Sequence, residues 1–149
     1  MSLKQDVIDT CRDLLKSRQL ELQKDEESAR ESAASETKSS AGDKHETSRE
    51  LIHRDREIIT QSLNELSKQL LELDKAQDAA SSDLIRLGSI VKTSLGYFFL
   101  GPSLGFVNSN DLKVACVSVS APIALVILGK SAGESVNFRG NILKIESVA

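Results

Sequence analysis

The 149-residue sequence has few aromatic residues, and those it has lie in one half of the chain. Aromatics make up 3% of the residues, tryptophan is absent, and all four Phe and the single Tyr follow residue 96. The first half therefore cannot form a conventional aromatic core. Residues 2–80 also contain no Pro and only one Gly, Gly42, so few residues in this stretch would interrupt a helix.

The sequence also lacks a strong excess of either charge. A net charge of -3 and a pI near 5.5 argue against a nucleic-acid-binding protein that relies on overall positive charge. With 40% apolar and 28% charged residues, the composition is typical of a folded chain with one ordinary domain or two small ones.

Long apolar runs are missing as well. Residues 1–10 carry three charged side chains and no apolar stretch of the kind found in secretory signals, which predicts a cytoplasmic protein. The most apolar segment, 112–128, contains a lysine, serines and Pro122, and it is shorter than the ~20 apolar residues that a membrane helix needs. We expect a buried strand and a turn in this segment, and no association with a membrane.

The chain has only two cysteines, Cys11 and Cys116, which are far apart in the sequence. They lack the paired spacing of a zinc site. We interpret them as buried thiols of the core or of a helix seam, in a protein of a reducing compartment, without a reactive role.

The first half of the chain has the pattern of a helical hairpin. Gly42 and the serines before it provide a reversal, and each arm would then have some 35 residues, or roughly 50 Å of helix. In the second arm apolar residues recur at the a and d positions of a heptad repeat, and the first arm has a weaker repeat. The second-arm seam is Ile52, Ile59, Leu63, Leu66, Leu70 and Leu73, and the first-arm seam is Ile8, Leu15, Leu22 and Ala29.

The second half has the pattern of a small β-rich domain. Short β-like runs at 84–91, 95–100, 112–119, 136–138 and 142–145 are separated by turn residues. Pro near the start and Gly at the end predict one short helix over 122–129. The predicted fold is therefore α+β: an antiparallel coiled-coil hairpin over 1–79, with its tip near 39–46, followed by a domain over 80–149.

Two carboxylates, Asp43 and Glu46, lie at the predicted tip of the hairpin. An Asp at the N-cap and a Glu three residues later form a capping-box arrangement, which is a sufficient structural explanation of the pair. The same two carboxylates could instead hold Mg²⁺ weakly and complete a metal site in another molecule, because Mg²⁺ accepts a few carboxylates together with water and phosphate. The two interpretations are compatible.

Three side chains that can carry positive charge follow the tip at helical spacing, namely Arg49, His53 and Arg56. They could meet a nucleic-acid backbone. The alternative, which we favour, is a solvated face on which these side chains pair with neighbouring acids. His53 is then a surface histidine.

Two segments of the sequence resemble a known family. Residues 41–46, Ala-Gly-Asp-Lys-His-Glu, match a Gly-Asp-x-x-Glu motif, and residues 119–136 match a second motif that runs from Val-Ser-Ala-Pro to Gly-Lys-x-x-Gly-Glu-x-Val. Both motifs are found, in this order, in the Gre transcript cleavage factors of bacterial RNA polymerase (GreA and GreB). The resemblance spans nearly the whole chain and implies a coiled coil followed by a domain similar to the FKBP fold.

The resemblance also implies a function. In this family the globular domain docks at the rim of the polymerase secondary channel, and the coiled coil reaches a backtracked RNA 3′ end. Asp43 and Glu46 fall on the two tip acids that help to hold the second Mg²⁺ and orient the attacking water. Ser120 and Pro122 fall on a loop expected to contact the channel rim, and Arg49 and Arg56 would lie near the nucleic acid.

On this interpretation the protein is a monomeric accessory factor that is not an enzyme on its own, and its Mg²⁺ is shared with the polymerase. Residues 47–50, Thr-Ser-Arg-Glu, replace the family's usual Asn-Ala-Glu-Tyr, so a regulator that binds the channel without stimulating cleavage remains an alternative. A peptidyl-prolyl isomerase, suggested by the FKBP-like domain, and a plain coiled-coil oligomerisation module are further alternatives.

Overall fold

The computed structural model describes residues 2–38 and 43–149, with the side chains of 36–38 and 43–46 excluded. The described chain forms two compact units, Leu15–Lys68 and a second unit of Met1–Leu14 with Gln69–Ala149. These units reflect packing and do not test the predicted division into residues 1–79 and 80–149. None of the helices in the described ranges is long and apolar enough to cross a membrane.

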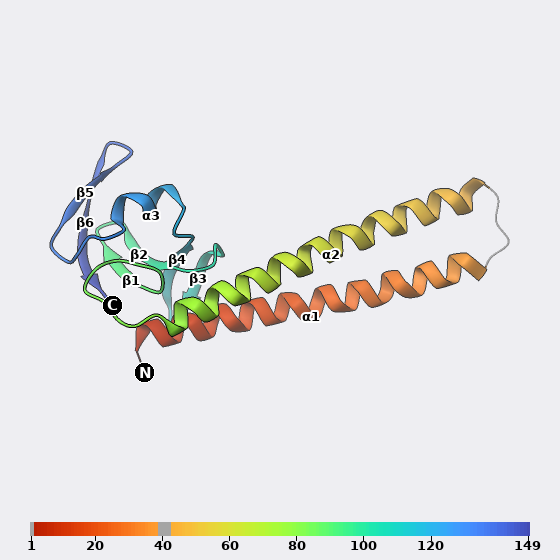
Figure 1. Cartoon of the computed structure of the whole chain (residues 1–149), viewed down its shortest axis with the longest axis horizontal. Helices are drawn as coiled ribbons and strands as arrows, with labels where there is room; N and C mark the ends of the chain where they lie inside the picture. The colour runs from red at the N-terminus through yellow and green to blue at the C-terminus, as the bar shows by residue number, and fades with distance from the viewer. Residues whose placement is uncertain (1, 39–42) are drawn as a thin grey trace. The chain divides into compact units, whose positions relative to one another are not determined.

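Two long helices confirm the predicted hairpin. Helix α1 is Leu3–Lys38 and helix α2 is Asp43–Asp78, each of 36 residues, which corresponds to about 54 Å of helix. The helices run side by side in opposite directions (Figure 1). The predicted reversal at residues 39–42 lies outside the described residues.

The predicted apolar seam is also confirmed in the unit Leu15–Lys68. Leu15 and Leu66 are buried, and the remaining seam residues of this unit are half-buried: Leu22, Ala29, Ile52, Ile59 and Leu63. Leu20, Leu51 and Ile58 lie off the seam, and each is more than half exposed. Heptad spacing therefore correctly predicts which face of each helix is covered.

The other unit contains a six-stranded sheet in the order β3-β4-β2-β1-β6-β5. All neighbouring strands are antiparallel except β2 and β4, which are parallel. The strands are β1 (Ile90–Thr93), β2 (Gly96–Leu100), β3 (Gly105–Ser109), β4 (Leu112–Val117), β5 (Ser135–Phe138) and β6 (Asn141–Val148). Two helices followed by this sheet confirm the predicted α+β class.

Two details of the predicted strands are wrong. Strand β3 was expected to be turn, because Gly105 and Asn108 favour turns; it is an edge strand, and the reversal comes at Asn110 and Asp111, which both have positive φ. Residues 84–89 were expected to be strand, but they form an irregular connection.

The connection before β1 is irregular because it makes a close approach to α2. Gly88 has φ +90, and a Cβ atom at this position would come within 2.5 Å of the carbonyl oxygen of Ala76. Only glycine fits this contact without displacing the backbone. Strand β1 begins two residues later, at Ile90.

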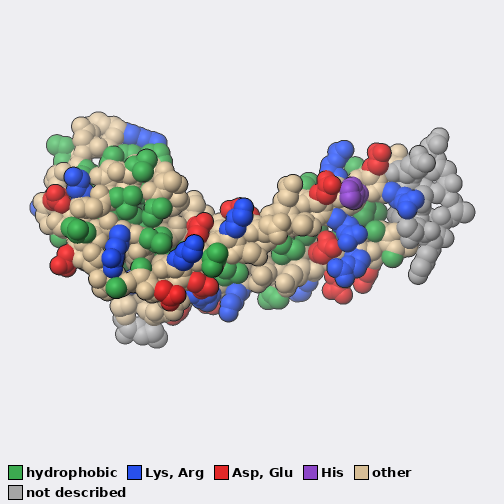
Figure 2. Space-filling model, in the orientation of Figure 1, with side chains coloured by type: hydrophobic (Ala, Val, Ile, Leu, Met, Phe, Trp, Pro, Cys, Tyr) green, Lys and Arg blue, Asp and Glu red, His purple; other side chains and the backbone are tan. Residues whose placement is uncertain are grey.

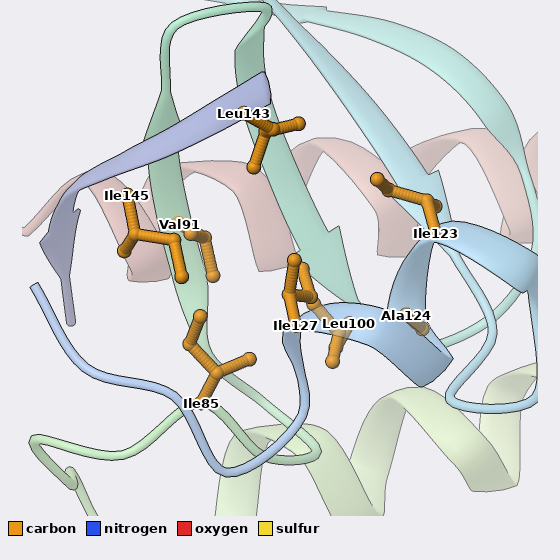
Figure 3. Close-up of a cluster of buried hydrophobic side chains, with 8 residues drawn as sticks. All are labelled: Ile85, Val91, Leu100, Ile123, Ala124, Ile127, Leu143 and Ile145. Atoms are coloured by element: carbon orange, nitrogen blue, oxygen red, sulfur yellow. The ribbon is translucent and has the colours of Figure 1, made fainter. Parts of the chain in front are cut away.

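One core of this unit lies between the sheet and helix α3, which is Pro122–Ile127 and confirms the predicted short helix. Figure 3 shows side chains from α3, β1, β2 and β6 converging with Ile85 of the irregular connection. The buried cluster consists of Ile85, Val91, Leu100, Ile123, Ala124, Ile127, Leu143 and Ile145. These buried members are all aliphatic, and two partly buried aromatic residues, Phe98 and Phe138, pack against them.

The ends of the long helices that belong to this unit are also buried. Val7, Ile8 and Leu73 are each no more than 1% exposed. Arg12 of α1 forms an ion pair with Asp74 of α2 at 2.9 Å. The base of the hairpin is thus a second apolar layer, closed at its surface by a charged pair.

Replacing Ile127 by Ala should lower the free energy of unfolding by about 2–5 kcal/mol, because the fully buried side chain leaves a cavity beside the sheet. The matched control is Leu125→Ala on the same helix, where the side chain is 64% exposed and the expected change is within about 0.5 kcal/mol. Urea titration followed by circular dichroism measures both. Equal losses for the two variants would contradict the assignment of the core.

Candidate functional site

The predicted acidic tip falls at the start of helix α2. Asp43 is the first residue of the helix, and Glu46 lies in its first turn. Their side chains lie outside the described residues, so both the capping interpretation and the metal interpretation stay predictions. A helix N-terminus favours negative charge, which is compatible with either role.

Two of the predicted basic side chains behind the tip, His53 and Arg56, are paired with acids. His53 lies at the surface, as predicted, and its Nε2 atom is 3.1 Å from Glu57 Oε1. Arg56 Nη2 is 3.0 Å from Glu26 Oε1, and this ion pair connects the two arms of the hairpin. The visible face of the hairpin shows acidic and basic side chains interspersed (Figure 2).

Arg56 has a structural role that the sequence analysis missed. Glu26 is only 21% exposed, and it also lies 3.7 Å from Arg30, so Arg56 helps to neutralise a carboxylate that is largely covered. Glu26 and Arg56 are each fifteen residues from position 41, near the predicted reversal. Equal distance from the turn could therefore have identified them as facing residues in opposite arms.

Arg49 is exposed on the same helix and lines a hollow with Ala33, Ile52, His53 and Arg56. The hollow is about 140 Å³ in volume. Three basic side chains line this hollow, and two of them, His53 and Arg56, are paired with carboxylates. Proximity of Arg49 and Arg56 to nucleic acid stays a prediction.

The second predicted site lies in the turn before α3. The hydroxyl groups of Ser118 and Ser120 are 2.7 Å apart, and the Ser120 N–H donates to the Ser118 hydroxyl oxygen. Ser120 and Pro122 are exposed, and Leu125, one turn beyond Pro122 on α3, is 64% exposed. The turn therefore presents an uncharged, partly apolar surface that the fold does not use internally.

The end of the second sequence motif has a structural explanation. Gly129 has positive φ, its N–H donates to the Ile85 carbonyl, and the Ile85 N–H donates to the Lys130 carbonyl, both at 2.8 Å. The Ser131 N–H donates to the Glu134 carboxylate at 2.6 Å, and this bond is the main cause of the lowered pKa of Glu134. These residues form turns that support the core, so they are not themselves assigned a binding role.

Within the described residues, no group of three or more His, Cys, Asp or Glu side chains could hold a metal ion. The two cysteines are buried, as predicted, but they are also neighbours, with Sγ atoms 3.6 Å apart. Nothing in their sequence spacing indicated this contact.

Comparisons with known proteins give one similarity to a solved structure. No protein-family model matches the sequence, and no curated protein matches it. A structure described as that of the transcription factor Gfh1 is 15% identical, with 93% of each chain covered and a TM-score of 0.36.

The ion pair between Glu26 and Arg56 should stabilise the hairpin, with a coupling free energy of about 0.5–1 kcal/mol. A double-mutant cycle of Glu26→Gln and Arg56→Gln, followed by helix content during urea unfolding, measures this coupling. Arg54→Gln, a neighbouring exposed arginine, serves as the control in a parallel cycle with Glu26→Gln. Equal coupling of Glu26 to both arginines would contradict the specific pairing.

Proposed function

We propose that this protein is a transcription elongation factor that binds RNA polymerase at its secondary channel and stimulates cleavage of backtracked RNA. The observation that carries the proposal is the position of Asp43 and Glu46 at the start of α2, where two 36-residue helices meet the predicted reversal. The resemblance of residues 41–46 and 119–136 to the Gre factors supplies the partner and the reaction.

The hairpin has the dimensions that such a role requires. Helices of about 54 Å are much longer than a two-helix interface needs for its own stability, and the seam becomes less apolar towards the tip. Beyond Leu22, the first arm has only Ala29, Ala33 and Ala34 as apolar residues before residue 38. A slender, weakly apolar end is suited to enter a channel lined by another protein.

The donor chemistry at the tip fits a shared magnesium ion. Asp43 and Glu46 would provide hard carboxylate oxygens, which Mg²⁺ prefers, while the polymerase and water complete the octahedron. When bound, the cation would neutralise charge on the phosphodiester and activate water at neutral pH. The chain's own contribution is to bring two carboxylates to the RNA and to accept hydrogen bonds that orient the water.

The exposed turn before α3 is the proposed polymerase-binding surface. Ser120 provides a hydroxyl group, while Pro122 and Leu125 provide apolar area on adjacent turns. An uncharged surface with a central apolar contact is typical of the buried part of a protein interface. In this proposal the turn before α3 binds the polymerase, and the tip of the hairpin provides the metal ligands.

Arg49 and Arg56 would lie near the nucleic acid in this arrangement. Arg49 is exposed, whereas Arg56 already neutralises Glu26, so Arg49 is the better candidate for a phosphate contact. A single added phosphate contact would contribute modestly and would weaken with salt.

The test is transcript shortening in a backtracked RNA polymerase complex with Mg²⁺. The wild-type protein should accelerate cleavage, and Asp43→Asn or Glu46→Gln should reduce this acceleration at least tenfold, because each change removes a charged metal ligand. Asp55→Asn, an exposed acid farther along α2, is the matched control and should change the rate less than about twofold.

Equal, slow shortening with wild type and Asp43→Asn would refute the catalytic role. In that case competition with a known Gre factor for polymerase distinguishes the remaining possibilities. Competition without cleavage would identify a channel-binding regulator, which the replacement at residues 47–50 favours as the second candidate. Absence of competition would refute polymerase binding altogether.

A further inference from the structure

The two cysteines of this chain form a pair in space that the proposed function does not use. They are separated by 105 residues in the sequence, yet their Sγ atoms are 3.6 Å apart. Cys11 lies on α1 and Cys116 on β4, and both side chains are buried, with exposures of 0% and 1%. No other cysteine is present in the sequence.

The pair lies where helix α1 meets strand β4, the second strand in the order of the sheet. Cys11 follows the buried residues Val7 and Ile8 on the covered face of α1. Cys116 pairs with Phe99 of β2 on one side and with Gly105 of β3 on the other. A bond between the two sulfur atoms would therefore connect the first turns of α1 to β4, between the edge strand β3 and β2.

The two sulfur atoms are in non-bonded contact at 3.6 Å, with no other side chain required to move from between them for a bond to form. The S–S bond of a disulfide is about 2.05 Å long, so the two Sγ atoms would need to approach by roughly 1.5 Å. Side-chain rotation with a small adjustment of α1 on the sheet can supply such a movement. Two thiols that only filled space would not need to face one another at the same point of the interface.

We propose that Cys11 and Cys116 are a site of reversible oxidation, which closes to an intramolecular disulfide in the presence of a peroxide. In the first step one Cys thiol loses its proton, and the thiolate sulfur attacks one oxygen of hydrogen peroxide. The O–O bond breaks, the departing hydroxide takes up the proton, and the products are a sulfenic acid and water. The second thiol then attacks that sulfur and releases another water. Two thiols and one hydrogen peroxide thus yield one disulfide and two water molecules.

The two thiols share one hydrogen bond, in which either sulfur can be the donor. This bond lowers the pKa of Cys11, whereas the same bond and burial raise the pKa of Cys116. Either thiol can attack the peroxide first, and the other then attacks the sulfenic acid. Because both groups are buried, the reaction requires a local opening and is slower than that of exposed thiols.

The expected consequence is a more stable base of the hairpin. A cross-link that closes a loop of this length reduces the freedom of the unfolded chain, and we expect the Tm of the oxidised protein to rise by roughly 10 °C.

The experiment treats the reduced full-length chain with hydrogen peroxide in native buffer and again in urea. In native buffer we expect loss of both free thiols, a monomer whose mass is lower by about 2 Da, and a linked peptide pair containing Cys11 and Cys116. A thiol reductant should reverse these changes and the rise in Tm. Cys11→Ala and Cys116→Ala, as single-thiol controls, should show no such monomeric product and no rise in Tm.

Several outcomes would overturn the proposal. They are unchanged thiols in native buffer, irreversible sulfinic acids with a gain in mass, disulfide-linked dimers, and a disulfide that forms only in urea. The comparison between native buffer and urea uses the wild-type chain alone, so it stays decisive even where a cysteine variant fails to fold.

Discussion

The narrow apolar seam between α1 and α2 is the interaction on which the hairpin depends. Two helices bury only one stripe each, so all apolar stabilisation must come from the a and d positions. Leu15 and Leu66 are fully covered, whereas Ala29 and Ile52, nearer the tip, are only half-buried. Charged pairs such as Glu26 with Arg56 supplement the seam where its side chains become small.

The base of the hairpin is stabilised by contacts with the sheet. Val7, Ile8 and Leu73 are buried in the unit that contains the sheet. Hydrogen bonds from Thr10 and Asn110 join helix α1 to the end of strand β3. The aliphatic cluster under α3 forms a separate core in that unit. Both apolar layers therefore belong to the unit that contains the sheet.

Local pattern predicted much of this structure. Heptad spacing identified both helices and the covered face, and Pro122 with Gly129 marked α3, because these signals depend on neighbouring residues only. The sequence did not predict strand β3, because Gly105 and Asn108 are residues that favour turns. The predicted start of β1 was too early, because the backbone at Gly88 is in close contact with Ala76.

Other features could not be read from local pattern at all. The pairing of β2 with β4 and the contact between Cys11 and Cys116 join residues that only the complete topology brings together. For the acidic pair the sequence gives more than the structure. Asp43 and Glu46 were identified by motif and spacing, while their side chains lie outside the described residues. Their role accordingly rests on chemistry and on resemblance to the Gre factors.

The most direct measurement of the central claim is a photo-crosslink from the tip of the hairpin. A photoreactive amino acid at position 44, in place of Lys44, leaves Asp43 and Glu46 unchanged. In a backtracked RNA polymerase complex, the account predicts crosslinks to the RNA 3′ end and to the polymerase active centre. Crosslinks confined to the outer surface of a polymerase that has bound the protein would contradict it.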